Sequence, residues 1–220
     1  MSNSTPESRS LRAVIFDLGG VVLGSPLHAI ARYESSLGIP RNAINRVVMD
    51  TAPGGAWHQL ERGEIDMPRF FRDFEKECAT AGHPIDASAM FSEMAAEAQP
   101  RPAMLRAIER IKAEGLRVAA LTNNWATEES TDAPDSGTRA LASLFDEFVE
   151  SSVEGLRKPD PRIYELVCRR LGVAPQEAAF LDDIGANLKP ARSMGMTTIR
   201  VVQPEPALAE LEAALGFSLS

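Results

Sequence analysis

Residues 11–23 have the sequence LRAVIFDLGGVVL, a short apolar run that ends at an acidic residue and turns at two glycines. Its segment Ala13–Phe16 is too short and too continuously apolar for a surface helix, and valine, isoleucine and phenylalanine favour strands. We therefore predict a strand buried on both faces, with Asp17 at its carboxyl end. Ligands bind at that edge of open α/β sheets. Asp17 is thus a candidate nucleophile or metal ligand, or only the cap of the following turn.

The composition is that of an ordinary globular protein. The chain has 220 residues, of which 44% are hydrophobic, enough for a sizeable core and a smaller second unit. No apolar run approaches the roughly 20 residues that a membrane span needs, and the polar N-terminus lacks the apolar stretch of a signal peptide. We expect a cytoplasmic protein, without a membrane partner, in which residues 1–10 form a disordered tail.

Charge and cysteine usage exclude further classes. The net charge of −8 disfavours binding to nucleic acid or to membrane surfaces, so an anionic substrate would require a local basic group. Cys78 and Cys168 lie far apart and outside any metal-binding motif. We expect both to be free, buried thiols.

The segment of residues 25–99 shows helical periodicity and no convincing strand. Glycine and proline mark the loops between its apolar stretches. We predict an all-helical insertion that leaves an α/β core of residues 11–24 and 100–220. The predicted helices cover residues 27–37, 41–50, 56–62, 68–81 and 87–98.

Strands and helices alternate after residue 100, which predicts a parallel sheet with helices on both faces, a Rossmann-like α/β fold. Pro159-Asp160-Pro161 marks the start of one of these helices. Because Pro190 fits only near a first turn, another helix should begin close to Asn187. A helix-rich section with a turn-prone segment at 132–137 should precede the third strand. Strands are predicted at 116–121, 148–151, 178–181 and 197–202, and the last two helices at 187–194 and 207–215.

Polar residues end three of the predicted strands at the same edge. They are Asp17, Thr122–Asn123 and Asp182–Asp183, and Lys158 lies between the last two in sequence. Two carboxylates and a backbone carbonyl suit Mg²⁺, a hard cation that also binds phosphate. A further carboxylate oxygen could attack phosphorus, while hydroxyl, amide and ammonium groups hold the other phosphate oxygens. The set therefore indicates phosphoryl transfer.

These motifs resemble those of the haloacid dehalogenase (HAD) superfamily in order and spacing, and the helical insertion resembles its C1-type cap. The third and fourth motifs are particularly similar to the N-terminal phosphatase domain of soluble epoxide hydrolase and its relatives. The four motifs are FDLGGVV at 16–22, LTNN at 121–124, RKPDPRIY at 157–164 and FLDDIGANLKPARSMGM at 180–196.

The resemblance implies a Mg²⁺-dependent phosphatase that acts on a small phosphate ester through an aspartyl phosphate. It makes Asp17 the nucleophile and Lys158 the lysine of the third motif. The metal would be held by Asp17, the carbonyl of Gly19 and Asp183, with Asp182 in support. Phosphate would be bound by Thr122, Asn123 and Lys158.

One position departs from the family pattern. Most phosphatases of this family have Asp two residues after the nucleophile, where this chain has Gly19. That side chain protonates the leaving group and then activates water, and losing such a group typically costs about 10²- to 10⁴-fold. Three functions remain open: a slow or leaving-group-selective phosphatase, a non-catalytic module that binds a phosphate ligand, and a 2-haloacid dehalogenase, since those relatives also lack the second acid.

Within the insertion, Trp57, His58 and Arg62 could reach over the active site and select the substrate. Alternatively Trp57 shares a helical face with Leu60 and belongs to the core of the insertion, as we expect for the phenylalanines at 70, 71 and 74. Arg157 could bind a second anionic group or be a solvated charge. The protein is expected to be a monomer or a homodimer.

Overall fold

The computed structural model describes residues 10–125 and 141–219. The predicted tail, apart from Ser10, and the predicted turn at 132–137 lie outside the described residues. In the described part, the core is a parallel sheet in the order β3-β2-β1-β4-β5. The strands are β1 Ala13–Phe16, β2 Arg117–Thr122, β3 Glu147–Glu150, β4 Ala178–Asp182 and β5 Thr197–Arg200.

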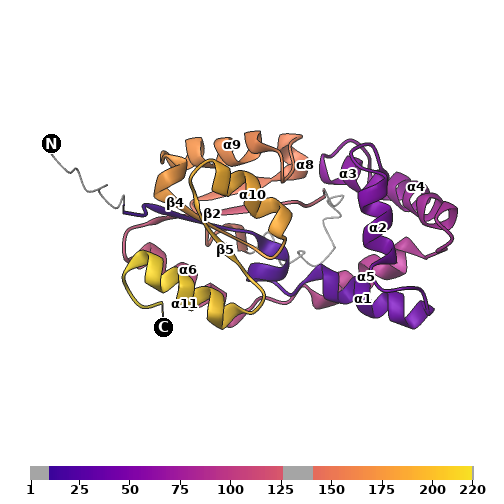
Figure 1. The fold of residues 1–220 in the computed structure, drawn as a ribbon, viewed down its shortest axis with the longest axis horizontal. Helices are drawn as coiled ribbons and strands as arrows, with labels where there is room; N and C mark the ends of the chain where they lie inside the picture. The colour runs from indigo at the N-terminus through magenta and orange to yellow at the C-terminus, as the bar shows by residue number, and fades with distance from the viewer. Residues whose placement is uncertain (1–9, 126–140, 220) are drawn as a thin grey trace, which may run out of the picture.

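Helices cover both faces of this sheet (Figure 1). Val14 and Phe16 of the central strand pack against α6 and α11, whereas Ala13 and Ile15 pack against α9 and α10. All four side chains are fully buried, which confirms the prediction of a strand buried on both faces. These helices are α6 Pro102–Ala113, α9 Pro161–Leu171, α10 Gly185–Ser193 and α11 Pro204–Leu215.

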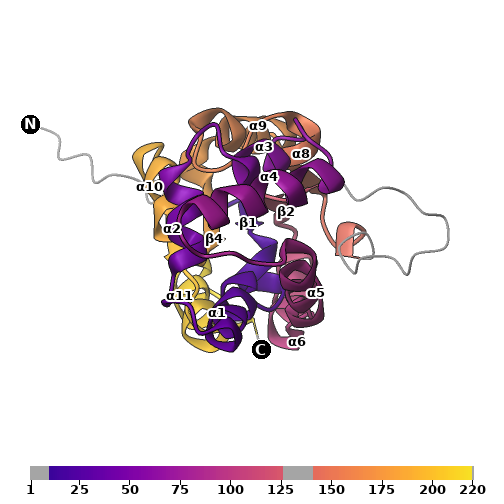
Figure 2. The ribbon, with the colours of Figure 1, turned by 90° about the vertical axis from the view of Figure 1, so that its right-hand side faces the viewer.

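Between β1 and α6 the described chain forms helices and no strand, as predicted. These helices enclose a hydrophobic cluster of their own that contains Phe70 and Phe74. They lie beyond one end of the sheet, and Figure 2, seen from that side, places them in front of β1, β2 and β4. The role of this helical insertion as a cap stays a prediction. Its helices are α1 Pro26–Leu37, α2 Ala43–Asp50, α3 Ala56–Glu61, α4 Met67–Thr80 and α5 Ala87–Glu97.

Two chain segments that run side by side join the insertion to the core. Leu23 and Pro100 form an antiparallel bridge, and the Gly24 N–H donates to the Gln99 carbonyl at 3.0 Å. The insertion therefore leaves and re-enters the core at one place.

The start of α10 differs from the prediction. The helix begins at Gly185, so Pro190 lies inside it rather than in its first turn. The side chain of Asp182 explains this start, because it accepts hydrogen bonds from the Ile184 N–H at 2.8 Å and from the Asn187 amide at 3.1 Å. These bonds fix the first turn upstream of the proline.

Other differences lie at element ends. The third strand ends at Glu150 because Ser151 begins a short helix, α8 Ser151–Glu154, that the sequence analysis did not predict. The fifth strand ends at Arg200, which is paired with the last residue of β4. The final helix begins earlier, at Pro204, since a proline in the first turn gives up no helical hydrogen bond.

Candidate active site

Three polar side chains lie at the carboxyl edge of neighbouring strands. Asp17 directly follows β1, Thr122 ends β2 and Asp182 ends β4. The strand order places β1 between the other two strands, and the Asp17 N–H donates to the Leu181 carbonyl at 2.9 Å. All three side chains are buried. The fold thus gathers at one point groups that are far apart in sequence.

Lys158 links two of the acidic residues. Its ammonium lies 2.9 Å from Asp17 Oδ1 and 2.7 Å from Asp182 Oδ2, and the residue is 1% exposed. Burial by itself lowers the pKa of Lys158, but the carboxylates of Asp17 and Asp182 outweigh it, so the pKa is raised. The ammonium therefore stays charged and compensates two buried carboxylates.

Asp182 is a positioning residue in this network. Besides Lys158 and the Ile184 N–H, it accepts from the Asn187 amide, which lies 3.1 Å from each carboxylate oxygen. Both oxygens are thus occupied within the protein. Sequence reasoning missed Asn187, whose only signal was its place near the start of a helix after an acidic pair.

Asp183 has a more open environment. Its carboxylate accepts from the Ser25 hydroxyl at 3.3 Å and lines a cavity between the core and the helical insertion. Burial and the neighbouring Asp182 raise the pKa of Asp183 to about 6. Burial also raises the pKa of Asp17; Lys158 opposes this, and Asp182 and Asp183 add to it. Both carboxyl groups lack sufficient compensating charge.

A divalent cation would supply the positive charge that Asp17 and Asp183 lack. Asp17, Asp182 and Asp183 each offer an oxygen within 4.8 Å of the others, so hard oxygen donors converge at one point. Such a donor set suits Mg²⁺, which prefers carboxylate oxygens, waters and phosphate. Since Asp182 is already bonded to Lys158 and Asn187, Asp17 and Asp183 are the residues that could hold the ion.

The two glycines after Asp17 have different structural roles. Gly20 has φ +80°, and a Cβ there would lie 2.1 Å from Asp183 Oδ2, so only glycine fits. Gly19 has φ −65° and ψ 123°, which any residue adopts, and its Cβ would lie 3.3 Å from the Pro26 ring. The backbone therefore does not require glycine at position 19.

Replacing Gly20 by alanine should displace Asp183 and weaken Mg²⁺ binding about tenfold or more, because a charged ligand with its hydrogen bond is worth roughly 1.5–3 kcal/mol. Gly115→Ala is the matched control, since Gly115 has φ +82° and open space around it. Calorimetric Mg²⁺ titration of both variants is the measurement. Equal affinities in both would show that Gly20 does not position Asp183.

Asn123 uses its side chain differently from the prediction. Its amide donates to the Lys158 carbonyl at 3.1 Å, and its Oδ1 accepts from the Lys158 N–H at 2.8 Å. The amide therefore fixes the backbone of Lys158 instead of pointing a free donor at phosphate. In this arrangement, a phosphate contact by residue 123 would have to come from its backbone N–H.

A partly buried ion pair joins the insertion to the site. Arg157, next to Lys158, donates from Nε to Glu61 Oε2 of α3 at 2.6 Å. Trp57 Nε1 donates to the other oxygen of Glu61 at 3.0 Å. Arg157 is thus neither a solvated charge nor a free anion-binding group, and Glu61 is a residue that sequence reasoning did not single out.

Trp57 lies in an aromatic cluster rather than over open space. Its ring centroid is 5.7 Å from Phe91 and 6.4 Å from Trp125, and Phe91 and Trp125 are 4.8 Å apart. Trp125 follows Thr122 by three residues, so the loop after β2 packs into the core of the insertion. This supports the interpretation of Trp57 as a core residue.

His58 is buried next to this junction and its Nδ1 has no hydrogen-bond partner among the described residues. Burial, then Arg157 and Arg62, lower the pKa of His58 from 6.5 to about 4. At a pH between these two pKa values, His58 is protonated in the unfolded chain and neutral in the folded chain. The free energy of unfolding therefore falls as the pH falls through this window.

From these pKa values, protonation of His58 in the unfolded chain should lower the free energy of unfolding by about 2 kcal/mol between pH 7.5 and pH 5. His58→Leu should remove this part of the pH dependence. Urea unfolding at both pH values measures this difference. His28→Gln is the control, a substitution of an exposed histidine away from this junction. A His58→Leu protein with the pH dependence of the unmutated chain would contradict the assignment.

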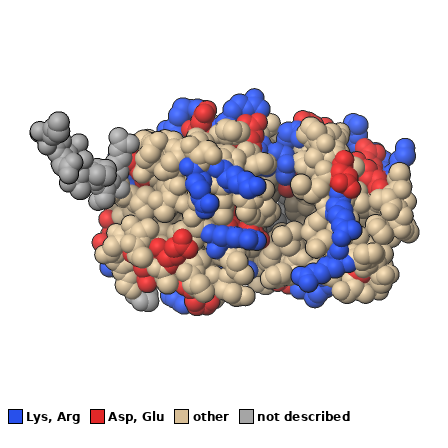
Figure 3. All heavy atoms as spheres, viewed as in Figure 1, with Lys and Arg blue, Asp and Glu red and all other residues tan. Residues whose placement is uncertain are grey.

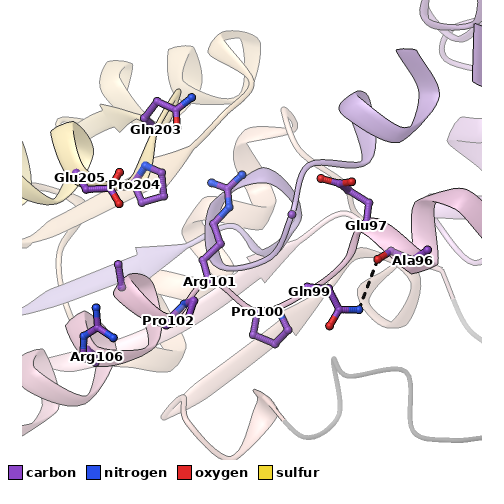
Figure 4. Close-up of a pocket in the computed structure, with 12 residues that line it drawn as sticks. Ala96, Glu97, Gln99, Pro100, Arg101, Pro102, Arg106, Gln203, Pro204 and Glu205 are labelled. Atoms are coloured by element: carbon purple, nitrogen blue, oxygen red, sulfur yellow. Dashed lines mark hydrogen bonds between the residues drawn. The ribbon is translucent and has the colours of Figure 1, made fainter. Parts of the chain in front are cut away.

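A further cavity is larger than the one beside Asp183. It measures about 700 Å³ and lies where the chain returns from the insertion to α6. Figure 4 shows Arg101 crossing it toward the loop after β1, where its guanidinium donates to the Gly20 carbonyl at 2.9 Å. None of the site residues predicted from the sequence lines this cavity.

Residues 11–195 match the model of the haloacid dehalogenase-like hydrolase family. The chain therefore belongs to this family of hydrolases, as the four motifs predicted. Both cysteines are free and buried, as expected. Among the described residues, no helix combines the length and apolar character needed to cross a membrane.

Curated relatives include mouse acyl-CoA dehydrogenase family member 10, which is 41% identical over 96% of this chain and 20% of its own length. Mouse bifunctional epoxide hydrolase 2 is 38% identical over 94% of the chain and 39% of its own length. The chain thus spans two fifths or less of these relatives. Sesquiterpene phosphatase astK from Aspergillus oryzae is 27% identical over 94% of the chain and 98% of its own length.

Solved structures share the fold. A HAD family enzyme from Bacteroides thetaiotaomicron, in complex with magnesium and inorganic phosphate, has a TM-score of 0.60 at 18% identity, covering 89% of this chain and 98% of its own. A dehalogenase with an intermediate complex has a TM-score of 0.62 at 26% identity, covering 94% and 97%.

Proposed function

We propose that the chain is a Mg²⁺-dependent phosphatase that hydrolyses small phosphate esters through a phosphorylated Asp17. The observation that carries this proposal is the position of Asp17 at the sheet edge, 2.9 Å from the Lys158 ammonium and within the acidic cluster. This gives one carboxylate a charged neighbour that can also hold phosphate oxygens. The phosphatase among the relatives that matches over nearly its whole length supports the same reaction.

The residues of the site support the following order of reaction steps. The Asp17 carboxylate attacks phosphorus, a bond forms between them, and the bond to the leaving oxygen breaks. Water then attacks phosphorus, which releases phosphate and regenerates Asp17. Lys158, the Thr122 hydroxyl and the backbone N–H of Asn123 would bind the phosphate oxygens. Mg²⁺, held by Asp17, the Gly19 carbonyl and Asp183, would neutralise phosphate charge when bound.

Gly19 determines which esters react well. Because it has no side chain to protonate a leaving oxygen, alkyl phosphates should react slowly. Acyl phosphates and anomeric sugar phosphates leave more easily and need less protonation. We therefore propose that such compounds are the substrates, with the helical insertion acting as a cap.

Phosphate release from a panel of substrates tests the proposal. The panel contains acetyl phosphate, glucose 1-phosphate and p-nitrophenyl phosphate, each with Mg²⁺ and with excess EDTA. We expect release from at least one of them, and its loss in EDTA. Tight binding of a phosphate ester without any release would instead support the non-catalytic module.

A dehalogenase is the second candidate, because Gly19 matches enzymes that lack the second acid and a dehalogenase structure shares 26% identity. Asp183 is half-buried, and burial and the neighbouring Asp182 raise its pKa to about 6 in spite of Lys158, which is difficult to explain in an enzyme without a metal. Halide release from 2-haloacids in EDTA would favour this candidate over the phosphatase.

A further inference from the structure

The cavity next to Asp183 has an unusual charge for this acidic protein. It measures about 270 Å³ and lies between the core and the helical insertion. Three arginines line it from three separate parts of the chain: Arg41 before α2, Arg101 before α6 and Arg200 at the end of β5. Asp183 is the acidic residue in its lining. We call this the arginine cavity.

Two of these arginines are fixed to the site itself. Arg101 donates to the Gly20 carbonyl at 2.9 Å, and Arg200 Nε lies 3.4 Å from the Asp183 carbonyl. Gly20 and Asp183 belong to the loops that hold the acidic cluster. The arginine cavity therefore opens directly onto the proposed metal site.

Arg41 comes from the opposite side, on a backbone that is held firmly. The buried carboxylate of Glu34 accepts from the Asn42 N–H at 2.7 Å and from the Ile44 N–H at 2.9 Å. Asn42 has φ 63°, and this residue also lines the cavity. The guanidinium of Arg41 is exposed and makes no hydrogen bond or ion pair with any residue in the described part of the chain.

Basic side chains also gather on both sides of the hollow between the two parts of the molecule in Figure 3. The chain as a whole carries a net charge of −8, so this concentration is local. Planar guanidinium groups bind carboxylates and phosphates through paired hydrogen bonds. A volume of about 270 Å³ suits a compact polar group better than a long apolar tail.

We propose that the arginine cavity binds a second anionic group of the substrate, a carboxylate or a second phosphate, with Arg41 as the specificity-determining residue. The inference rests on the proposed phosphatase function and defines its substrate class. The preferred substrates are phosphate esters whose leaving group carries its own negative charge.

A matched pair of substrates tests this. Glucose 1-phosphate and glucuronic acid 1-phosphate differ only in a carboxylate at carbon 6, and glucose 1,6-bisphosphate carries a phosphate there. We expect KM at least about tenfold lower for one of the two anionic substrates, since a charged hydrogen bond contributes on that scale. The substrate with the lower KM shows whether the cavity prefers a carboxylate or a phosphate.

Arg41→Ala should raise KM for the preferred anionic substrate at least about tenfold more than for glucose 1-phosphate. Arg41→Lys should restore part of this difference, because it retains the charge without the planar fork. Arg46→Ala is the control, an exposed arginine of α2 that does not line the cavity. Equal effects of Arg41→Ala on all substrates would overturn the inference while leaving the phosphatase intact.

Measurements of ligand binding test the arginine cavity independently of the proposed phosphatase activity. If none of the sugar phosphates is hydrolysed, calorimetry gives their Kd values directly. Tighter binding of an anionic substrate that Arg41→Ala abolishes would support the arginine cavity even then. Equal Kd values for all three ligands would overturn it.

Discussion

Asp17→Asn should lower phosphate release by at least about three orders of magnitude, the scale of losing a covalent nucleophile. An amide cannot form the phosphorylated intermediate, although it has nearly the same shape as the carboxylate. After a single turnover with acetyl phosphate and Mg²⁺, mass mapping should place the phosphoryl group on Asp17 in the unmutated chain. The variant should carry none.

The variant is expected to fold. Burial and two neighbouring carboxylates raise the pKa of Asp17, so its charge is an unfavourable one that the amide removes. Thermal unfolding of both proteins controls for this. Phosphate mapped to another residue, or undiminished turnover in a folded variant, would refute Asp17 as the nucleophile.

Gly19→Asp should raise the hydrolysis of alkyl phosphates such as glycerol phosphate by about 10²- to 10⁴-fold, the usual contribution of a positioned general acid. The backbone at Gly19 already has a conformation that aspartate adopts, and the Pro26 ring has to shift only slightly. The gain should be much smaller for acetyl phosphate, whose leaving group needs little protonation. The ratio of kcat values for the two substrates is the measurement.

Gly19→Asn is the matched control, because it has the same size but has no carboxyl proton to give. If asparagine and aspartate change the rates equally, the effect comes from packing against Pro26 and not from acid catalysis. If neither variant changes the rate, protonation of the leaving group is not what limits this chain.

Much of the site could be predicted because its residues terminate strands. Asp17 and the Asp182–Asp183 pair each follow a buried apolar run, and a parallel sheet brings such ends to one edge. The buried central strand, the helices on both faces and the helical insertion were predicted on the same grounds. These features depend on local sequence and on simple rules of topology.

The parts that could not be predicted depend on contacts between distant side chains. The Arg157–Glu61 pair joins residues 96 positions apart, and neither has a local pattern that selects the other. The direction of the Asn123 amide depends on the backbone of Lys158, 35 positions away. Asn187 was predicted only as the start of a helix, and nothing in that local pattern indicates that its side-chain amide donates to Asp182.

The aromatic cluster at the junction has a practical consequence. The chain contains two tryptophans, and both belong to this cluster, with their rings 6.4 Å apart. Trp57 comes from the insertion, whereas Trp125 comes from the loop that leaves the strand ending at Thr122. The tryptophan fluorescence of the protein therefore originates at the junction between the insertion and the core. A movement of the insertion away from the sheet would separate the two indoles and change that emission, so the native chain carries its own optical reporter of opening.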